Sequence, residues 1–365
     1  MEITSANSFG GGERHLVDIS RGFVKRGHDV FIAMRDNPEL ENRLGFLPEE
    51  RIIKFALRNS LDLLSAHKIS RFLVQEKIDI VHAHLARDYP PASMATRLSR
   101  NTKFFITRHV MFPMKNMHKL VLGNVENAIA VSAAVESRLK RIFPVEKVVC
   151  IPNGLAMDEF SANERTKLSA EFKNEYNIPK NVKVVSIVGE LSEIKRQEDF
   201  VIAAGEIAKE LEDVHFVVVG IDNTFDQSER RKLRRLANAL NLENKFTFLD
   251  WIENLKPIFS ATDVLVSASL SESFGLAILE GMANGAAVVA TKTDGATELT
   301  NNGEFGKLVP LRDPLAIANN VLTLLQSDEL RFLIAESAAK RAFTTYGLDK
   351  MISATEALFL KSLSS

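Results

Sequence analysis

The chain has 365 residues, with 46 Lys and Arg against 47 Asp and Glu, so its formal net charge is −1. This length fits about two domains of ~150 residues each, and the balanced charge gives no indication of a nucleic-acid partner. Cys150 is the only cysteine, which excludes an intrachain disulfide and a cysteine-based zinc site and is typical of a reducing compartment.

The start of the chain and its apolar runs predict a cytoplasmic protein. The first residues lack the basic region and apolar core of a signal peptide. No uncharged apolar run reaches the ~20 residues of a membrane span. The charge is nevertheless uneven, because residues 1–150 contain 23 Lys and Arg against 16 Asp and Glu. The first half is thus basic, and its stretches 112–120 and 138–141 mix apolar and basic residues, which keeps peripheral contact with the inner membrane surface open. The alternative is that these stretches are ordinary amphipathic helices and that the uneven charge serves only solubility.

Strand-like and helix-like patterns alternate along the first half, which predicts βα units and a parallel sheet. Strands are expected at 2–6, 29–33, 78–83, 103–107, 128–131 and 147–151. Helices are expected between them, for example at 12–25 and 61–75.

The pattern loosens into a polar segment at 163–181 and then begins again. Further strands are expected at 182–188, 214–219, 246–249, 263–267 and 286–290, two helices within 313–344, and a last helix at 348–363. Two similar α/β halves joined near residue 155 predict two Rossmann-like domains, in which ligands gather at the carboxyl ends of the strands.

Three consecutive glycines, Gly10, Gly11 and Gly12, follow the first predicted strand and open a helix. Glycines let the backbone approach a ligand closely, and the N-terminus of a helix favours negative charge. The spacing differs from the dinucleotide G-x-G-x-x-G pattern, which disfavours a nicotinamide enzyme. A tight strand-to-helix turn without a ligand is the alternative interpretation.

Histidines stand at the ends of two predicted strands. His82 and His84 point to the same side of their strand, but no third metal ligand is evident nearby in the sequence, so no metal site is predicted. Packing is the simpler role for the pair, with His84 as a candidate for acceptor contact. His109 follows another strand and could hydrogen-bond a phosphate oxygen or a sugar hydroxyl.

Two carboxylates, Glu272 and Glu280, lie eight positions apart around a Phe-Gly step. They follow the strand-like run 263–268 and open the helix-like stretch 276–283. Eight residues make slightly more than two helical turns, so both carboxylates can face one cleft. Glu272 would stand among backbone N–H groups that have no intrahelical partner, which suits a polyhydroxylated, phosphorylated ligand. An amphipathic helix with a capping glutamate is the alternative.

This segment resembles the glutamate–seven–glutamate signature of retaining glycosyltransferases of family 4, which have the GT-B fold, and further similarities extend from Gly10 to the C-terminal helix. The resemblance implies an α/β protein with two Rossmann-like parallel-sheet domains facing a cleft. It implies an N-terminal acceptor-binding domain at 1–155, onto which the helix 346–365 packs back, and a nucleotide-sugar-binding domain at 156–345.

The resemblance also implies roles for individual residues. The catalytic residues would be His109, Lys195 and Glu272. The donor site would be formed by Gly189, Glu190, Lys195, Arg196, Ile252, Ser273, Phe274, Gly275, Leu276 and Glu280. The loop for acceptor and phosphate would be formed by Gly10, Gly11, Gly12 and His84. No metal or cofactor is implied, because the leaving phosphate of the nucleotide-diphosphate sugar is expected to help deprotonate the acceptor hydroxyl.

The chain departs from the family pattern at Glu190, where an arginine usually helps Lys195 to neutralise the donor diphosphate. A carboxylate there would repel a diphosphate. Arg196 or Arg108 could supply the missing charge, or Glu190 could pair with Lys195 and point away.

The sequence therefore predicts a metal-independent retaining hexosyltransferase. It would move a sugar from a nucleotide-diphosphate sugar to a glycan or lipid-linked acceptor, in the synthesis of a cell-surface polysaccharide. Glu190 keeps open a non-catalytic member that binds a sugar nucleotide or a partner protein, and a sugar-nucleotide epimerase of the same fold is a further alternative.

Overall fold

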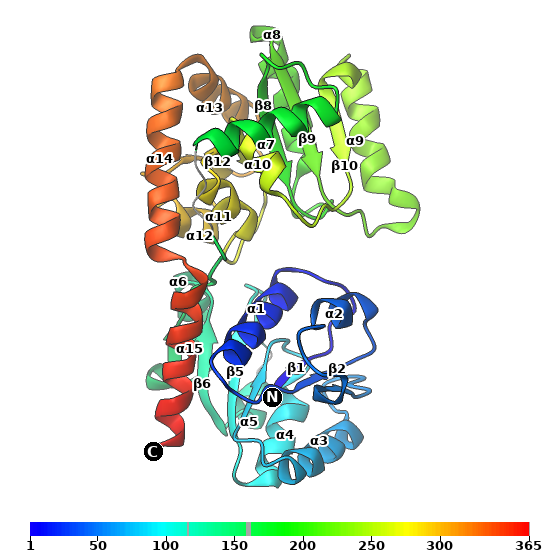
Figure 1. The fold of residues 1–365 in the computed structure, drawn as a ribbon, viewed down its shortest axis with the longest axis vertical. Helices are drawn as coiled ribbons and strands as arrows, with labels where there is room; N and C mark the ends of the chain where they lie inside the picture. Colours follow the sequence, from blue (N-terminus) through cyan, green and yellow to red (C-terminus); the bar gives the residue numbers. More distant parts are fainter. Residues whose placement is uncertain (115–116, 158–161, 365) are drawn as a thin grey trace. The chain divides into compact units, whose positions relative to one another are not determined.

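The computed structural model describes residues 1–114, 117–157 and 162–364, and the chain divides into two compact units (Figure 1). Unit 1 consists of Met1–Ala156 together with Tyr346–Ser365, and unit 2 of Met157–Thr345. Each unit contains one parallel sheet with helices around it, so the predicted α/β class with two Rossmann-like sheets is confirmed.

Unit 1 is built on a seven-stranded parallel sheet with the strand order β3-β2-β1-β4-β5-β6-β7. The strands are β1 (Glu2–Thr4), β2 (Ile32–Met34), β3 (Ile52–Lys54), β4 (Ile80–Ala83), β5 (Lys103–Arg108), β6 (Val125–Ala130) and β7 (Val148–Cys150). Their side chains are mostly buried, as expected for a parallel sheet covered on both faces. The chain changes direction across the sheet between β1 and β4, which makes this the topological switch point of unit 1.

The helices of unit 1 begin at recognisable caps. Asp62 accepts a hydrogen bond from Ser65 N, and Ser132 accepts one from Val135 N. The helices are α1 (Gly11–Lys25), α2 (Pro38–Arg43), α3 (Leu63–Gln75), α4 (Tyr89–Ser99), α5 (Met117–Val121), α6 (Ala133–Leu139) and α15 (Leu348–Leu363), with short 3-10 turns at Glu49–Arg51 and Val145–Lys147.

The C-terminal helix α15 packs beside α1 within unit 1, although more than 300 residues separate them in sequence (Figure 1). A Cβ on Gly22 would lie 2.3 Å from a methyl carbon of Ile352, so only glycine allows this approach. Arg26, directly after α1, pairs with Glu356 and Asp349 of α15, each at 2.5 Å. The apolar side of α15 enters the core that α1 and the sheet share.

Unit 2 contains a six-stranded parallel sheet with the order β10-β9-β8-β11-β12-β13. The strands are β8 (Lys183–Val188), β9 (Val214–Val219), β10 (Phe246–Leu249), β11 (Val264–Ser267), β12 (Ala287–Thr291) and β13 (Lys307–Val309). The switch point lies between β8 and β11, where crevices for ligands form in open α/β sheets.

The helices of unit 2 cover both faces of this sheet, and their side chains complete one apolar core. They are α7 (Ala162–Glu175), α8 (Gln197–Glu210), α9 (Ser228–Ala239), α10 (Lys256–Ala261), α11 (Leu276–Ala283), α12 (Asp294–Leu299), α13 (Pro314–Gln326) and α14 (Asp328–Thr345), with 3-10 turns at Phe225–Gln227 and Glu243–Lys245.

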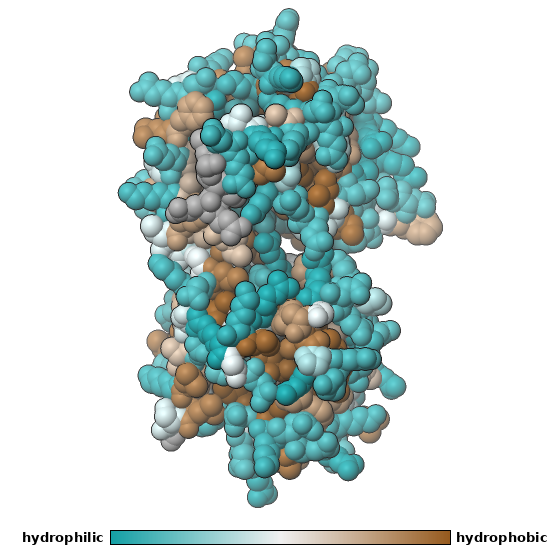
Figure 2. Space-filling view, viewed as in Figure 1, coloured by the Kyte–Doolittle hydropathy of each residue, from teal (hydrophilic) through white to brown (hydrophobic). Residues whose placement is uncertain are grey.

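All eleven predicted strands are present within a few residues of their expected bounds, and the last helix begins and ends as predicted. The sequence prediction missed β3 and β13, which are three-residue strands at sheet edges. Hydrophilic residues cover most of the face of each unit that is seen in Figure 2, with apolar patches on unit 1. Within the part of the chain that the structure describes, no helix is both long and apolar enough to cross a membrane.

Candidate active site

The predicted acceptor residues of unit 1 lie at the carboxyl ends of neighbouring strands. The glycine loop follows β1, His84 follows β4 and His109 follows β5. These strands adjoin one another in the order β1-β4-β5, so the loops meet at one edge of the sheet, at the switch point.

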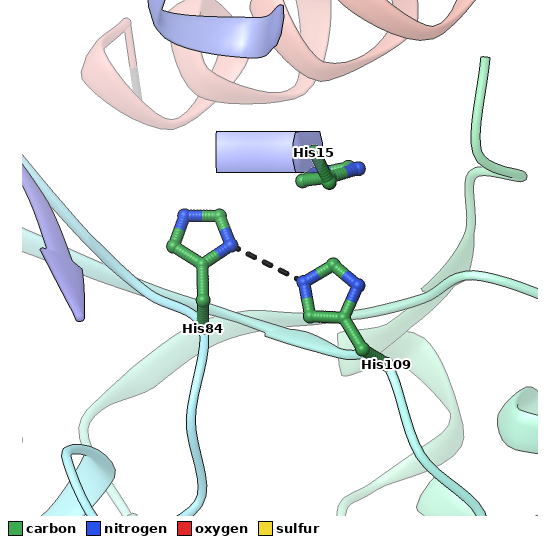
Figure 3. Close-up of side chains that lie close together, drawn as sticks. All are labelled: His15, His84 and His109. Carbon is green, nitrogen blue, oxygen red and sulfur yellow. Dashed lines mark hydrogen bonds between the residues drawn. The ribbon is translucent and has the colours of Figure 1, made fainter. Parts of the chain in front are cut away.

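His84 and His109 are brought together, and a third histidine joins them from helix α1 (Figure 3). His84 Nδ1 lies 3.3 Å from His109 Nε2, and their rings are stacked. The ring of His15 meets that of His109 edge-on, with 4.8 Å between centroids. His15 Nδ1 is 2.9 Å from Asn153 Oδ1. Three imidazoles from three elements therefore form one cluster, which we call the histidine cluster.

Beneath the histidine cluster lies a buried carboxylate, Glu2 of β1. Its Oε2 atom is 2.6 Å from His84 Nε2 and 2.8 Å from His82 Nδ1. The other ring nitrogen of His82 is 2.6 Å from Thr107 Oγ1. Because an ionised carboxylate only accepts hydrogen bonds, His84 carries a proton on Nε2, and the uncharged ring presents the lone pair of Nδ1 to His109.

Burial and mutual repulsion keep the histidine cluster uncharged. Desolvation lowers the pKa of His15 to about 3 and that of His84 to about 4, and it lowers the pKa of His109 well below the ordinary range. Neighbouring imidazoles add to the effect in each case. Burial alone would raise the pKa of Glu2, but His82 and His84 outweigh it and hold this pKa well below its usual value.

We expect acid to destabilise the protein through this cluster. In the unfolded chain both histidines have a pKa near 6.5, whereas in the folded protein the pKa of His15 is about 3 and that of His84 is about 4. The unfolded chain therefore binds more protons, and the free energy of unfolding falls as the pH drops from 6.5 to 4. At pH 5 each ring should lower the free energy of unfolding by about 1–2 kcal/mol. Urea unfolding in metal-free buffer at pH 7 and pH 5 measures the loss. This loss should be smaller in His15→Gln than in the wild type, and it should be unchanged in His67→Gln, which alters an exposed histidine. Equal losses in both variants would contradict the assignment.

The glycine loop lies directly beside the histidine cluster. A Cβ on Gly12 would stand 3.6 Å from the ring of His109. Gly10 and Gly11 are exposed at the start of α1, and Gly10 N donates to Glu13 Oε2 at 3.1 Å. The loop therefore presents exposed backbone at the N-terminus of a 15-residue helix, next to His109.

In unit 2 an ion pair and a backbone hydrogen bond join the two loops at the switch point. Lys195 Nζ lies 2.5 Å from Glu272 Oε1, and Ser269 Oγ donates to the same oxygen at 2.8 Å. Leu270 N also donates to Ile194 O at 2.8 Å. Two of the predicted catalytic residues, from loops 77 positions apart, thus share one site.

The Phe-Gly step begins helix α11 as the sequence indicated. Gly275 has φ +100° and stands before Leu276, the first residue of the helix. Phe274 is buried, and a Cβ on Gly295 would lie 2.3 Å from its carbonyl oxygen, so a second glycine allows the loops to approach. Ser273 is partly exposed in the loop before this step.

The second carboxylate of the motif, Glu280, is buried on α11. At the far edge of the same sheet, Ile252 is partly exposed just after β10. Gly189, with φ +152°, follows β8 and opens the loop that carries Lys195. The roles of the donor-site residues stay predictions.

The structure shows how the unusual Glu190 is accommodated. Its side chain is exposed and accepts a hydrogen bond from Asn223 Nδ2 at 2.9 Å, while Lys195 pairs with Glu272 instead. Arg196 is bound to Asp199 through two hydrogen bonds of 3.0 and 2.6 Å. Arg108 belongs to unit 1, where it donates to Phe112 O at 2.5 Å.

Several residues of these sites were absent from the sequence prediction. They are Glu2, His15, Asn153 and Ser269. His15 belongs to the glycine-loop motif and lies four residues, about one helical turn, after Gly11; Ser269 lies three residues before Glu272. Glu2 and Asn153 depend on contacts between distant segments.

Two Rossmann-like parallel-sheet domains, each with polar loops at its switch point, are the architecture of the GT-B class of proteins, and the solved structures described below share this fold. Two family models match this chain. Residues 9–159 match the model described as Glycosyltransferase Family 4, and residues 169–341 match Glycosyl transferases group 1. The chain belongs to the family 4 glycosyltransferases.

Two curated relatives share 25% and 30% of the aligned residues. N-acetyl-alpha-D-glucosaminyl L-malate synthase of Bacillus anthracis is 25% identical over 248 residues, which are 67% of this chain and 62% of the relative. D-inositol 3-phosphate glycosyltransferase of Corynebacterium jeikeium is 30% identical over 196 residues, 53% of this chain and 46% of the relative. The matched region thus spans about half to three-fifths of these relatives.

Solved structures reproduce the fold over nearly the whole chain. A glycosyltransferase from Rickettsia africae has a TM-score of 0.89 at 22% identity, covering 100% of this chain and 98% of that one. HepE of Anabaena, in complex with UDP and glucose, has a TM-score of 0.85 at 21% identity, covering 99% and 98%. At these identities the likeness establishes the fold alone.

Proposed function

We propose that the protein is a retaining glycosyltransferase that transfers a sugar from a nucleotide-diphosphate sugar to an acceptor hydroxyl. The observation that carries the proposal is the pairing of Lys195 with Glu272 at the switch point of unit 2. One cation and one carboxylate there offer charge to a diphosphate and hydrogen-bond acceptors to sugar hydroxyls.

In this proposal unit 2 binds the donor. Lys195 neutralises the diphosphate as it leaves, and Glu272 holds the hydroxyls of the donor sugar. The loop from Ser273 to Leu276 supports sugar and phosphate with backbone N–H groups, Glu280 receives the ribose, and the turn at Ile252 borders the base. Catalysis comes from orientation and from stabilisation of the departing diphosphate.

Unit 1 binds the acceptor in this proposal. The exposed glycine loop and His109 face the acceptor, and the leaving phosphate takes the proton of its hydroxyl on the same face of the sugar. Transfer on this route needs no metal and no cofactor. A role for His109 is supported by its position beside Gly12 and by the uncharged state that burial imposes on its ring.

The relatives guide the search for substrates. One is named for an N-acetylglucosaminyl transfer to malate, one for transfer to inositol 3-phosphate, and a structural neighbour holds UDP and glucose. For this chain we propose a glycan or lipid-linked acceptor in surface polysaccharide synthesis, at the cytoplasmic side of the membrane. Phe112 and Leu120, in one of the stretches suggested for membrane contact, are 68% and 84% exposed, while residues 115–116 lie outside the described part.

The decisive first experiment is thermal unfolding with UDP, GDP, ADP, CDP and their common sugars. A ligand at a hundred times its dissociation constant adds ~2.7 kcal/mol to stability, enough for a clear upward shift in Tm. One selective shift identifies the base, and release of free nucleotide only when an acceptor is added identifies transfer. Conversion of the sugar without acceptor would instead indicate an epimerase, and no shift with any nucleotide would favour the non-catalytic alternative.

Glu190→Arg is expected to tighten binding of the selected nucleoside diphosphate by about 3- to 10-fold, because an exposed like charge near the phosphates is replaced by an opposite one. Isothermal titration measures the change. Glu193→Arg is the matched control, since it makes the same charge change at an exposed position of the same loop. Equal effects of both variants, or none, would place the phosphates away from Glu190.

A further inference from the structure

The histidine cluster brings together more ring nitrogens than contact with an acceptor requires. Each of the three histidines offers one ring nitrogen, and the three nitrogens, from His15, His84 and His109, lie within 4.8 Å of one another. Imidazole is a preferred ligand of Zn²⁺, at Zn–N distances of about 2.0–2.1 Å. Three such ligands around one ion are spaced by roughly 3.3 Å, which is the observed separation of His84 Nδ1 and His109 Nε2.

The hydrogen bonds of the cluster leave one ring nitrogen of His84 and one of His15 without a proton. His84 gives its Nε2 proton to Glu2, which leaves Nδ1 as the coordinating atom of the uncharged ring. His15 gives its Nδ1 proton to Asn153 Oδ1, which leaves Nε2. This Nε2 atom is buried, on a residue only 5% exposed, and has no hydrogen-bond partner among the described residues. A buried lone pair without a partner is costly, and a cation would satisfy it.

The outer contacts match those that support metal-bound histidines. Such histidines usually donate their second N–H to a carboxylate or a carbonyl oxygen, which fixes the tautomer and ring orientation. Glu2 plays this part for His84 and Asn153 for His15. Glu2 also supplies a negative charge close to the cluster, which offsets the charge of a divalent ion.

We propose that His15, His84 and His109 bind one Zn²⁺ ion in unit 1, with water in the fourth position and Glu2 and Asn153 as outer partners. His109 coordinates through Nε2 and then carries its proton on Nδ1. A second group, formed by Glu2, His82 and His84, is less suitable, because its three members are fully buried and already bonded to one another or to Thr107.

If His109 contacts the acceptor, as the proposed function requires, zinc at this position alters that contact. The ion occupies the nitrogen of His109 that faces the cluster, so zinc binding and the apo arrangement of His109 exclude each other. Zinc would therefore change which nitrogen of His109 carries the proton in the proposed acceptor site, with Nδ1 protonated in place of Nε2.

Zinc binding is measured by competition with a chromophoric chelator on the full chain after treatment with EDTA. We expect one Zn²⁺ per chain, and with Co²⁺ we expect the visible absorption of a tetrahedral site. Absence of both in the wild-type protein would overturn the proposal. That result would not contradict the proposed function, because the nucleotide experiment measures donor binding, which is proposed for unit 2.

Variants locate the ion. Glu2→Gln keeps all three rings and should weaken zinc binding by about 10- to 100-fold, as expected for loss of an outer carboxylate. His15→Gln removes a ligand and should weaken it at least as much. His67→Gln, an exposed histidine outside the cluster, is the matched control and should bind as the wild type does. Unchanged zinc affinity in folded His15→Gln would overturn the proposal. If that variant fails to fold, zinc affinity is measured in Asn153→Ala, and unchanged affinity there would overturn the proposal in the same way.

Discussion

Glu272→Gln is expected to reduce sugar transfer by about 10²- to 10³-fold in kcat/KM, the loss typical of removing one preorganised electrostatic contact to the transition state. Glutamine keeps the size of the side chain and can still accept a hydrogen bond from Ser269. It loses the charge that holds Lys195 at 2.5 Å. The proposed contacts to donor hydroxyls and the position of Lys195 are therefore both weakened.

The measurement is steady-state transfer with the nucleotide sugar found by thermal shift. Glu206→Gln is the matched control, because Glu206 also pairs with a lysine of unit 2, Lys209 at 2.8 Å, but on the surface of α8. It should keep transfer within about twofold, since surface ion pairs contribute little. Full activity of Glu272→Gln would remove this loop from the active site.

The regular part of the fold could be predicted because its signals are local. Apolar runs such as that of β9 in unit 2 are long enough to identify a buried strand, and their alternation with helices indicates parallel sheets. The edge strands β3 and β13 each contain a lysine and only two apolar residues, and most of their side chains are only partly buried, so neither gives the signal of a buried strand. The start of α3 was placed two residues early because Asp62, its cap, lies inside the apolar pattern.

The candidate site of unit 1 could be predicted only in part. The sequence places His84 and His109 at strand ends, but it does not reveal that β1 lies beside β4 and thereby puts Glu2 under His84. His15 and Asn153 meet across 138 residues. The sequence therefore shows no third metal ligand beside His82 and His84, whereas the fold assembles three imidazoles and a carboxylate around His84.

In unit 2 the motifs predicted the loops but not the pairing between them. Lys195 and Glu272 were identified separately, and the sequence left open a pairing of Lys195 with Glu190. In the structure Lys195 pairs with Glu272, whereas Glu190 accepts a hydrogen bond from Asn223. The choice is geometric, because the loops after β8 and β11 flank the same switch point.

Lys195→Met is expected to have the other large effect, a fall of about 10²- to 10³-fold in kcat/KM. The substitution keeps the length of the side chain and removes the cation that balances Glu272, a carboxylate only 13% exposed. In the proposed complex it also removes the positive charge nearest the leaving diphosphate. Donor affinity should therefore fall together with kcat, as read from isothermal titration and steady-state rates.

Lys209→Met is the control, because Lys209 is an exposed lysine paired with Glu206. The more informative comparison is the double variant Lys195→Met/Glu272→Gln. If the two side chains act as one unit, the second substitution should cost little after the first, so that the double variant transfers sugar about as slowly as either single one. Fully multiplicative losses would instead mean that Lys195 and Glu272 serve the donor independently, and that their contact in the free protein has no part in catalysis.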